Sequence, residues 1–317
     1  MITYEVLKQR QAMPLEAKIA FTQSRIRAWY SHWQGDVYIS FSGGKDSTVL
    51  LEIAKGMFSD IPAVFCDTGL EYPEVRQFAL SKADVVLKPK MNFKQVIETY
   101  GYPVIGKKQA RMIRELKNPH SGNAKVCNLY KTGYTSDGKY SPSFKLADRW
   151  LPLVDAPFKV SEQCCYIMKK HPMEQYERET QRKPFIATMT EESSLRQTAY
   201  LKNGCNAFDS KRPKSQPLAI WSEQDVLRYI KQNGVEYASC YGGIVEGKDG
   251  SLHTTREKRT GCMFCMFGVH LDGTPNRFQR MERDYPKQYE YCINKLGVGA
   301  VLDYVGIPYK YEPTLFD

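Results

Sequence analysis

Apolar and polar positions alternate between two periods along the first hundred residues. Short and almost continuously apolar runs predict buried strands at 36–41, 62–66 and 84–87. Segments with helical spacing of their apolar positions predict helices at 46–55, 73–82 and 93–100. Strands that alternate with helices at this spacing predict right-handed βαβ units on a parallel sheet.

The flanking segments extend this pattern. An amphipathic helix is expected at 15–33, with Ile26 and Trp29 on its core-facing side. Further strands are expected at 185–189 and 217–220, and Ser222 is a helix N-cap for 223–232. The predicted fold class is therefore α/β, a doubly wound parallel sheet with an appended C-terminal region that carries cysteines.

The expected domain organisation has three parts. Residues 1–34 form an N-terminal helical segment, 35–232 form the nucleotide-binding domain, and 233–317 form a C-terminal region that completes a metal site. Within the second part the pattern loosens over 101–160, which begins with a basic stretch, Lys107 to Lys117, and predicts an inserted flap.

One loop has the composition of a phosphate-binding turn. Ser42-Gly43-Gly44-Lys45-Asp46-Ser47 lies between a predicted strand and a predicted helix. Glycines let the backbone approach an anion, and the helix N-terminus adds free amides and a positive dipole. Lys45 adds a counter-charge, and Ser47 and Thr48 add hydroxyls. It is not a Walker A loop, because two fixed positions of that motif hold other residues.

Composition narrows the classes of partner. The chain of 317 residues carries 45 Lys and Arg against 35 Asp and Glu, a net charge of +10, which favours polyanionic partners. No apolar stretch approaches the length of a membrane span, and residues 1–20 lack the apolar run of a signal peptide. A cytoplasmic protein without a membrane partner is expected, and its nine cysteines then point to metal or redox chemistry.

Four segments resemble, in family order, the phosphoadenylyl-sulfate (PAPS) reductase branch of the adenine nucleotide alpha-hydrolase (PP-loop ATP pyrophosphatase) superfamily. They are Ser42–Ser47, Cys66–Gly69, Glu192–Arg196 and the run from Pro217 through Tyr229-Ile230. The resemblance covers about residues 35–270. It implies a protein that binds an adenine nucleotide and acts at its α-phosphorus, releasing pyrophosphate when the nucleotide is ATP.

The resemblance also implies roles for single residues. The chemistry would be carried by Lys45, Asp46, Asp67 and Arg196. The nucleotide would be bound by Ser40, Ser42, Gly43, Gly44, Lys45, Asp46, Ser47, Thr48, Asp67 and Ser193. One position departs from the pattern: Met189 stands where relatives often carry an arginine, so one expected anion-binding arginine is missing.

Four cysteines form two motifs, the adjacent Cys164-Cys165 and the pair Cys262 and Cys265. Spacing alone leaves zinc, a cluster or a structural thiol pair open, although adjacent cysteines serve several irons better than one small ion. Iron–sulfur members of the branch carry both motifs, so the resemblance implies a [4Fe-4S] cluster on these four residues. Flanking cations are expected to offset cluster charge or to form a solvated face: Lys169, Lys170, Arg256, Lys258 and Arg259.

The remaining cysteines are weighed separately. Cys66, beside Asp67 at the end of a predicted strand, is either a reactive thiol near the nucleotide or a packed core thiol. No special role is expected for Cys127, Cys205, Cys240 and Cys292.

Three functions fit these features. The leading hypothesis is an enzyme that cleaves ATP, bound with Mg²⁺, to AMP and pyrophosphate and so adenylates an acceptor for sulfur transfer, resembling DNA-phosphorothioation proteins. The alternative is a sulfonucleotide reductase acting on adenylyl sulfate or its 3′-phosphorylated form. Such reductases use a cysteine in the C-terminal tail as the nucleophile. In this sequence no cysteine follows Cys292, and the final segment, 309–317, contains none. The third is a non-catalytic iron–sulfur module that binds nucleic acid, which leaves the phosphate loop unexplained.

The expected partners follow from the leading hypothesis. DNA or tRNA would be the acceptor, since the net charge and the basic stretch suit phosphate contacts. A cysteine desulfurase would be the sulfur donor, and a homo-oligomer is also expected.

Overall fold

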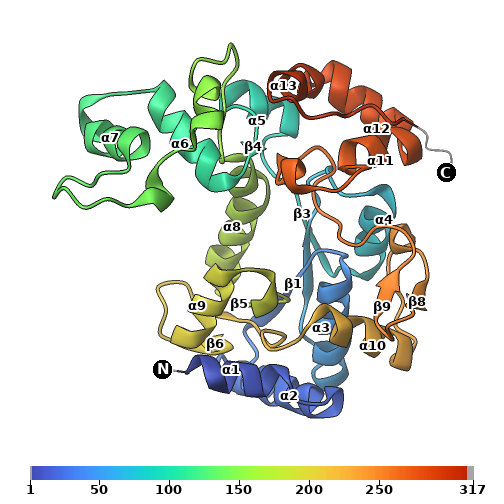
Figure 1. Cartoon of the computed structure of the whole chain (residues 1–317). Coiled ribbons are helices and arrows are strands. Elements are labelled where there is room, and N and C mark those ends of the chain that lie inside the picture. Colours follow the sequence, from blue (N-terminus) through green and yellow to red (C-terminus); the bar gives the residue numbers. More distant parts are fainter. Residues whose placement is uncertain (1, 313–317) are drawn as a thin grey trace. The chain divides into compact units, whose positions relative to one another are not determined.

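The computed structural model describes residues 2–312 and divides them into two compact units (Figure 1). Unit 1 runs from the N-terminus to Lys88 and continues over Pro172–Thr260, and unit 2 comprises Pro89–His171 and the chain from Gly261 onward. The sequence after Cys292 contains no cysteine, and its last residues, 313–317, lie outside the described residues.

Unit 1 is built on a six-stranded sheet in the order β3-β2-β1-β5-β7-β6. The strands are β1 (Val37–Phe41), β2 (Ala63–Cys66), β3 (Val85–Leu87), β5 (Lys183–Ile186), β6 (Asn206–Ala207) and β7 (Lys214–Ser215). All neighbours pair in parallel except β6 and β7, which are antiparallel. The mixed α/β fold with a mostly parallel sheet confirms the predicted fold class.

The helices of unit 1 include those predicted at 15–33, 46–55, 73–82 and 223–232, together with three that the sequence pattern does not predict. The helices of the unit are α1 (Tyr4–Gln11), α2 (Leu15–His32), α3 (Lys45–Met57), α4 (Pro73–Lys82), α8 (His171–Thr180), α9 (Ser194–Asn203) and α10 (Glu223–Asn233), with short 3-10 turns at Thr190–Glu192 and Ser239–Tyr241. A hairpin of β8 (Ile244–Glu246) and β9 (Leu252–Thr254) completes the unit. Both α2 and α10 pack against α3.

The strand order reverses between β1 and β5. After β1 the chain places β2 and then β3 on one side of it, and β5 pairs with the other side. The register Ser40↔Ile186 brings the carboxyl ends of β1 and β5 side by side. In open α/β sheets the crevice beside such a reversal is the usual place of a ligand site.

The predicted core is confirmed on α2. Ile26 and Trp29 are fully buried, and Trp33 packs against the same cluster. The Trp29 ring lies edge-on to Trp33 at a centroid distance of 5.6 Å. This aromatic stripe packs in the core and is not available for base stacking.

The predicted strand at 217–220 is wrong. These residues form turns, in which Ala219 N donates to Gln216 O and Trp221 N donates to Leu218 O. Their apolar character serves burial, since Leu218 and Ile220 lie in the core of unit 1. Short apolar runs do not distinguish a buried turn from a buried strand, and the sheet is instead extended by β7 and β6.

Unit 2 consists of short elements. Its helices are α5 (Phe93–Thr99), α6 (Lys107–Lys117), α7 (Ala124–Thr132), α11 (Arg277–Asp284), α12 (Pro286–Glu290) and α13 (Val298–Tyr304). Short 3-10 helices lie at Ser121–Asn123, Pro142–Phe144, Asp148–Val154 and Val269–Leu271, and π-helical turns lie at Tyr166–Lys170 and Tyr291–Lys295. Its two strands, β4 (Val104–Ile105) and β10 (Met266–Phe267), pair in parallel.

The compact units do not follow the expected domain boundaries. The segment expected as a C-terminal region, 233–317, is divided at Thr260, and the expected flap belongs to unit 2. Backbone pairing explains this difference. β4, close to the start of the flap, pairs with β10, and the Tyr102 hydroxyl donates to the carbonyl of Leu296.

No helix among residues 2–312 combines the length and the apolar character needed to cross a membrane. This finding agrees with the absence of an apolar run of that length in the sequence.

A buried ion pair joins α2 to α10, and its loss should be costly. Lys18 Nζ lies 2.6 Å from Asp225 Oδ2, with side-chain exposures of 4% and 7%. Replacing Lys18 with Met leaves a buried carboxylate without its cation, so we expect Lys18→Met to lower the free energy of unfolding by about 3 kcal/mol. Urea titration measures this, with the exposed Lys8→Met as the control. A loss under about 1 kcal/mol would contradict the assignment.

Candidate functional site

The predicted phosphate loop connects β1 to α3 with a left-handed turn. Gly43 has φ +72°, and Gly44 is the N-cap of α3. The Ser47 hydroxyl accepts from Ser42 N at 3.2 Å and lies 3.0 Å from the Ser42 hydroxyl. The first-turn amides of α3 have no partner within the helix, so the loop presents a helix N-terminus suited to an anion.

A pocket of about 280 Å³ opens at this loop. Its floor is formed by residues after β1 and after β5, the two strands between which the order reverses. The lining residues are Ser40, Ser42, Gly44, Lys45, Asp46, Ser47, Ile186, Ala187, Thr188, Met189, Glu192, Glu223, Tyr241, Lys258, Arg259 and Thr260. All of them belong to unit 1, so one compact unit builds the whole pocket.

Lys45 is buried and held by several partners. Its ammonium lies 3.2 Å from Glu223 Oε1, donates to the carbonyl of Lys258 at 2.9 Å, and lies 5.0 Å from the centre of the Tyr241 ring. The Tyr241 hydroxyl and Thr260 Oγ1 are 2.5 Å apart. A phosphate bound at the loop would compete with Glu223 for the same ammonium.

A second group of charges includes the lining residues Glu192 and Arg259. Glu192 forms ion pairs with Arg196 and with Arg259, the latter at 3.2 Å. Burial and the neighbouring Arg259 lower the pKa of Arg196. Two guanidinium groups therefore meet at one carboxylate, an arrangement that a bound anion could replace.

Asp46 carries the third carboxylate of the pocket. Its burial raises the pKa of this side chain, although the charges of Lys45, Arg259 and Arg196 act in the opposite direction. A buried carboxylate among cations is a suitable oxygen ligand for Mg²⁺, which usually takes one or two carboxylates together with phosphate oxygens.

The structure brings only part of the predicted nucleotide set to the pocket wall. Ser40, Ser42, Gly44, Lys45, Asp46 and Ser47 line it. The other residues of this set, Gly43, Thr48, Asp67 and Ser193, are not in the lining, and neither is Arg196, which is predicted for the chemistry. Three of them support it: Gly43 makes the turn, Ser193 caps α9 by accepting from Arg196 N, and Thr48 donates to the Gly44 carbonyl at 3.0 Å.

Asp67 is engaged elsewhere, at the end of β2. Both of its carboxylate oxygens accept from the Arg76 guanidinium, at 2.8 and 2.7 Å. This charge-assisted bond lowers the pKa of Asp67. The side chain is thus a buried partner of α4 and is already satisfied.

Sequence reasoning missed the residues that reach the pocket from distant segments. Glu223 begins α10, Tyr241 ends a short 3-10 turn, and Lys258–Thr260 come after β9. Lys258 and Arg259 are largely exposed, as the alternative of a solvated basic face predicts, and they also line the pocket of unit 1. Their basic run just before the cysteine pair gives no sign of the pocket.

The four motif cysteines lie together in unit 2. Cys164 Sγ and Cys165 Sγ are 4.0 Å apart, and charges on Cys262 and Cys265 act on the same thiols. The hydrogen bond from Cys164, together with the charges of Lys107 and Lys169, lowers the pKa of Cys165 to about 6. Burial raises the pKa of Cys265 to about 11.

Cys164, Cys165, Cys262 and Cys265 are the side chains of unit 2 that could hold a metal group. Among the described residues, no three His, Cys, Asp or Glu side chains are arranged around one point as ligands of a metal ion. Neighbouring cysteines can each ligate a different iron of a cluster, and the lysines near Cys165 would offset its charge. The other cysteines, Cys127, Cys205, Cys240 and Cys292, are buried, and Cys66 is half-buried.

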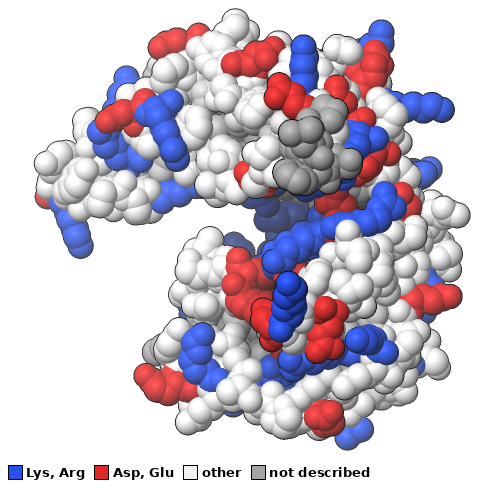
Figure 2. Space-filling model, turned by 45° about the vertical axis from the view of Figure 1, so that its right-hand side comes forward, with Lys and Arg blue, Asp and Glu red and all other residues white. Residues whose placement is uncertain are grey.

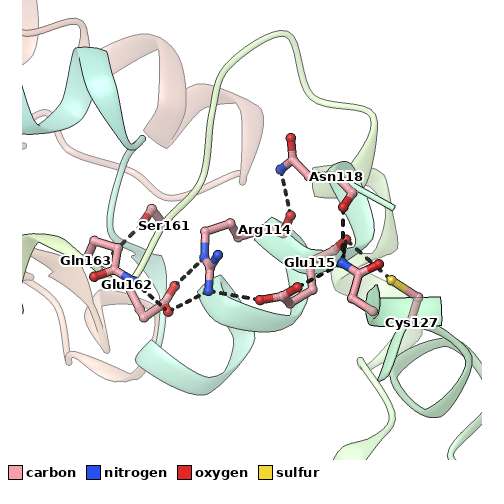
Figure 3. A network of polar contacts seen from close by, with 8 residues as sticks. Arg114, Glu115, Asn118, Cys127, Ser161, Glu162 and Gln163 are labelled. Carbon is pink, nitrogen blue, oxygen red and sulfur yellow. Dashed lines mark hydrogen bonds and ion pairs between the residues drawn. The ribbon is translucent and has the colours of Figure 1, made fainter. Parts of the chain in front are cut away.

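A polar network holds the segment before the cysteine pair (Figure 3). The Arg114 guanidinium of α6 donates to both carboxylate oxygens of Glu162 at 3.1 Å and also contacts Glu115. Glu115 accepts from Asn123 at 2.9 Å. The network ties α6 to residues 161–163, which directly precede Cys164, and so fixes the backbone from which the cysteines project.

Comparison with known proteins identifies the family. The profile of the phosphoadenosine phosphosulfate reductase domain matches residues 36–104 and 147–266. The chain therefore belongs to this family.

Individual proteins are also similar to this chain. An uncharacterized protein of Methanocaldococcus jannaschii is 26% identical over 264 residues, which covers 81% of this chain and 46% of that protein. The chain thus spans about half the length of this curated relative. A crystal structure of phosphoadenylyl-sulfate reductase from Candida auris, in a phosphate complex, matches with a TM-score of 0.38 and 14% identity, covering 75% of this chain and 91% of that one.

The phosphate loop should tolerate no side chain at Gly43. A Cβ there would lie 2.8 Å from the carbonyl oxygen of Val75, whereas Gly69, with a similar φ of +70°, has open space around it. We expect Gly69→Ala to cost about 1 kcal/mol through backbone strain alone, and Gly43→Ala to cost about 2 kcal/mol more through the added clash. Urea unfolding of both variants measures the difference, and equal losses would contradict the close approach.

Proposed function

We propose that this enzyme binds ATP in the pocket of unit 1 and cleaves it to AMP and pyrophosphate, thereby adenylating an acceptor for sulfur transfer. The observation that carries the proposal is the pocket at the carboxyl ends of β1 and β5, where the helix N-terminus, Gly44 and the buried Lys45 share one wall. These groups suit a chain of phosphates better than a small neutral ligand.

The proposed reaction takes place at the α-phosphorus of the bound ATP. An oxygen of the acceptor attacks the α-phosphorus, a new oxygen–phosphorus bond forms, and the bond to the pyrophosphate oxygen breaks. Negative charge builds up on the leaving pyrophosphate. Lys45 and the first-turn amides of α3 would stabilise that charge, since preorganised donors act strongly in a buried site.

The carboxylates of the pocket divide between two tasks. Asp46, and Glu223 once Lys45 turns to the phosphates, would hold Mg²⁺ from the protein side. When bound, the metal neutralises phosphate charge and orients the leaving group. Glu192 would release Arg196 and Arg259 to the anion, and these two would replace the arginine missing at Met189.

The acceptor and the sulfur supply are also proposals. A nucleic acid, DNA or tRNA, suits the net charge of +10. A cysteine desulfurase would be the donor protein. Cys164, Cys165, Cys262 and Cys265 would hold a [4Fe-4S] cluster, whose bound form would supply redox or sulfur chemistry; their clustering in one unit supports this assignment.

Pyrophosphate release should depend on Lys45. We expect Lys45→Ala to lower the rate of AMP and pyrophosphate formation from ATP by about 100- to 1000-fold, as losing one preorganised donor does. Lys55→Ala is the matched control, since Lys55 lies at the other end of α3 and pairs with Asp84. Mass spectrometry of the nucleotide products measures both. AMP with sulfite from adenylyl sulfate, and no AMP from ATP, would contradict the proposal and identify a reductase.

The cysteine assignment predicts iron. Protein purified without oxygen should be brown and contain about four irons per chain, and Cys164→Ser should lose most of them. Cys127→Ser, which changes another buried cysteine of unit 2, should retain them. Colourless protein with one zinc per chain would overturn the cluster.

A further inference from the structure

The charge of the chain is concentrated in one stretch that the family profile omits. The profile ends at 104 and resumes at 147. Residues 105–146 contain nine Lys and Arg and two Asp and Glu, a net charge of +7 against +10 for the whole chain. This stretch, the basic insertion, thus adds most of the positive charge to a domain that binds its nucleotide elsewhere.

Some cations of the basic insertion are used within unit 2. Arg114 pairs with Glu162, Lys117 donates to the carbonyls of Val154 and Ala156 at 2.8 and 2.7 Å, and Lys145 pairs with Asp148 at 3.0 Å. Lys107 is exposed and also interacts with Cys165. The other exposed cations are Lys108, Arg111, Lys125, Lys131 and Lys139. In Figure 2, Lys and Arg side chains project from the end of unit 2 that carries α6 and α7 in Figure 1.

Exposed aromatic rings lie among these cations. Tyr134 and Tyr140 are each 50% exposed, and their ring centres are 5.0 Å apart. Phe144 is 43% exposed, with Lys108 Nζ 4.3 Å from its ring centre. Aromatic rings are normally buried, so three exposed rings within eleven positions of the sequence require an explanation.

The backbone holds the two tyrosines in place. Tyr134 and Tyr140 pair across an antiparallel bridge, and Thr135 N donates to Lys139 O at 3.0 Å within the turn that joins them. Ser141 N donates to Gly133 O at 2.7 Å and closes the base of the turn. Rings fixed in this way lose little entropy when a flat ligand stacks on them.

We propose that the basic insertion binds single-stranded nucleic acid. The exposed cations contact successive phosphates, and unstacked bases pack on Tyr134, Tyr140 and Phe144. Cations that follow the backbone, with aromatic rings for the bases, are the combination that single strands require, whereas the bases of a duplex are not available for stacking. The inference deepens the proposed function, because it gives the acceptor a binding surface, but the binding itself requires no ATP cleavage.

Binding is measured by fluorescence anisotropy with a labelled mixed-sequence 20-nucleotide single strand, as DNA and as RNA, and with the matching duplex, all without ATP. We expect the single strand to bind more tightly than the duplex. With about five phosphate contacts, its affinity should fall roughly 100-fold between 50 and 200 mM salt. Lys45→Ala should bind normally, so failure of ATP cleavage and failure of this inference are separate results.

Variants distinguish stacking from charge. Tyr134→Ala with Tyr140→Ala should weaken single-strand binding by about 10-fold or more without changing its salt dependence, and Tyr134→Phe with Tyr140→Phe should retain it. Lys131→Gln with Lys139→Gln should weaken binding and reduce the salt dependence. Tyr4→Ala is the matched control, since Tyr4 is 49% exposed with Lys8 over its ring at 5.3 Å, but lies in unit 1.

Three results would overturn the inference. They are no binding at 50 mM salt, unchanged affinity in the tyrosine-to-alanine variant, and duplex binding as tight as single-strand binding. Thermal unfolding of each variant checks that it is folded. If the alanine variant is not folded, the phenylalanine variant keeps the test valid.

Discussion

The site depends on the reversal of strand order between β1 and β5. The chain leads from β1 to strands on one side of this pair and from β5 to strands on the other side. No common connection therefore covers the carboxyl ends of β1 and β5. Gly43 then turns the chain with a φ in the left-handed region, and a Cβ added at Gly43 would lie within 3 Å of the α4 backbone. Helix α3 begins directly after the N-cap residue Gly44. The pocket, its amides and the position of Lys45 all follow from this arrangement.

Local sequence was sufficient to predict the part of the site that one turn creates. The strand before Ser42, the glycines and the helix after Gly44 are short-range features, and the structure brings Ser40, Ser42, Lys45, Asp46 and Ser47 to one wall. Other lining residues come from positions some 150 to 220 residues later, such as Glu192, Glu223 and Arg259. No local periodicity predicts which distant segment will pack there.

The same limit explains the wrong strand at 217–220 and the division into compact units. The run at 217–220 is apolar because it is buried, and burial alone cannot fix its backbone conformation. The division of the chain at Thr260 depends on β4 pairing with β10, two strands of two residues each, which are too short to give a pattern. Asp67 follows β2, as predicted, but its carboxylate is paired with the guanidinium of Arg76, nine residues later in the sequence.

The central claim is that the turn after β1 binds the triphosphate of an adenosine nucleotide. A crystal structure with a non-hydrolysable ATP analogue and Mg²⁺ tests this most directly. The account predicts phosphate oxygens within hydrogen-bonding distance of the amides of Lys45, Asp46 and Ser47, with Lys45 Nζ moved from Glu223 to the phosphates. A nucleotide bound elsewhere, or a loop still closed by its own Ser42 and Ser47 with Lys45 on Glu223, would contradict it.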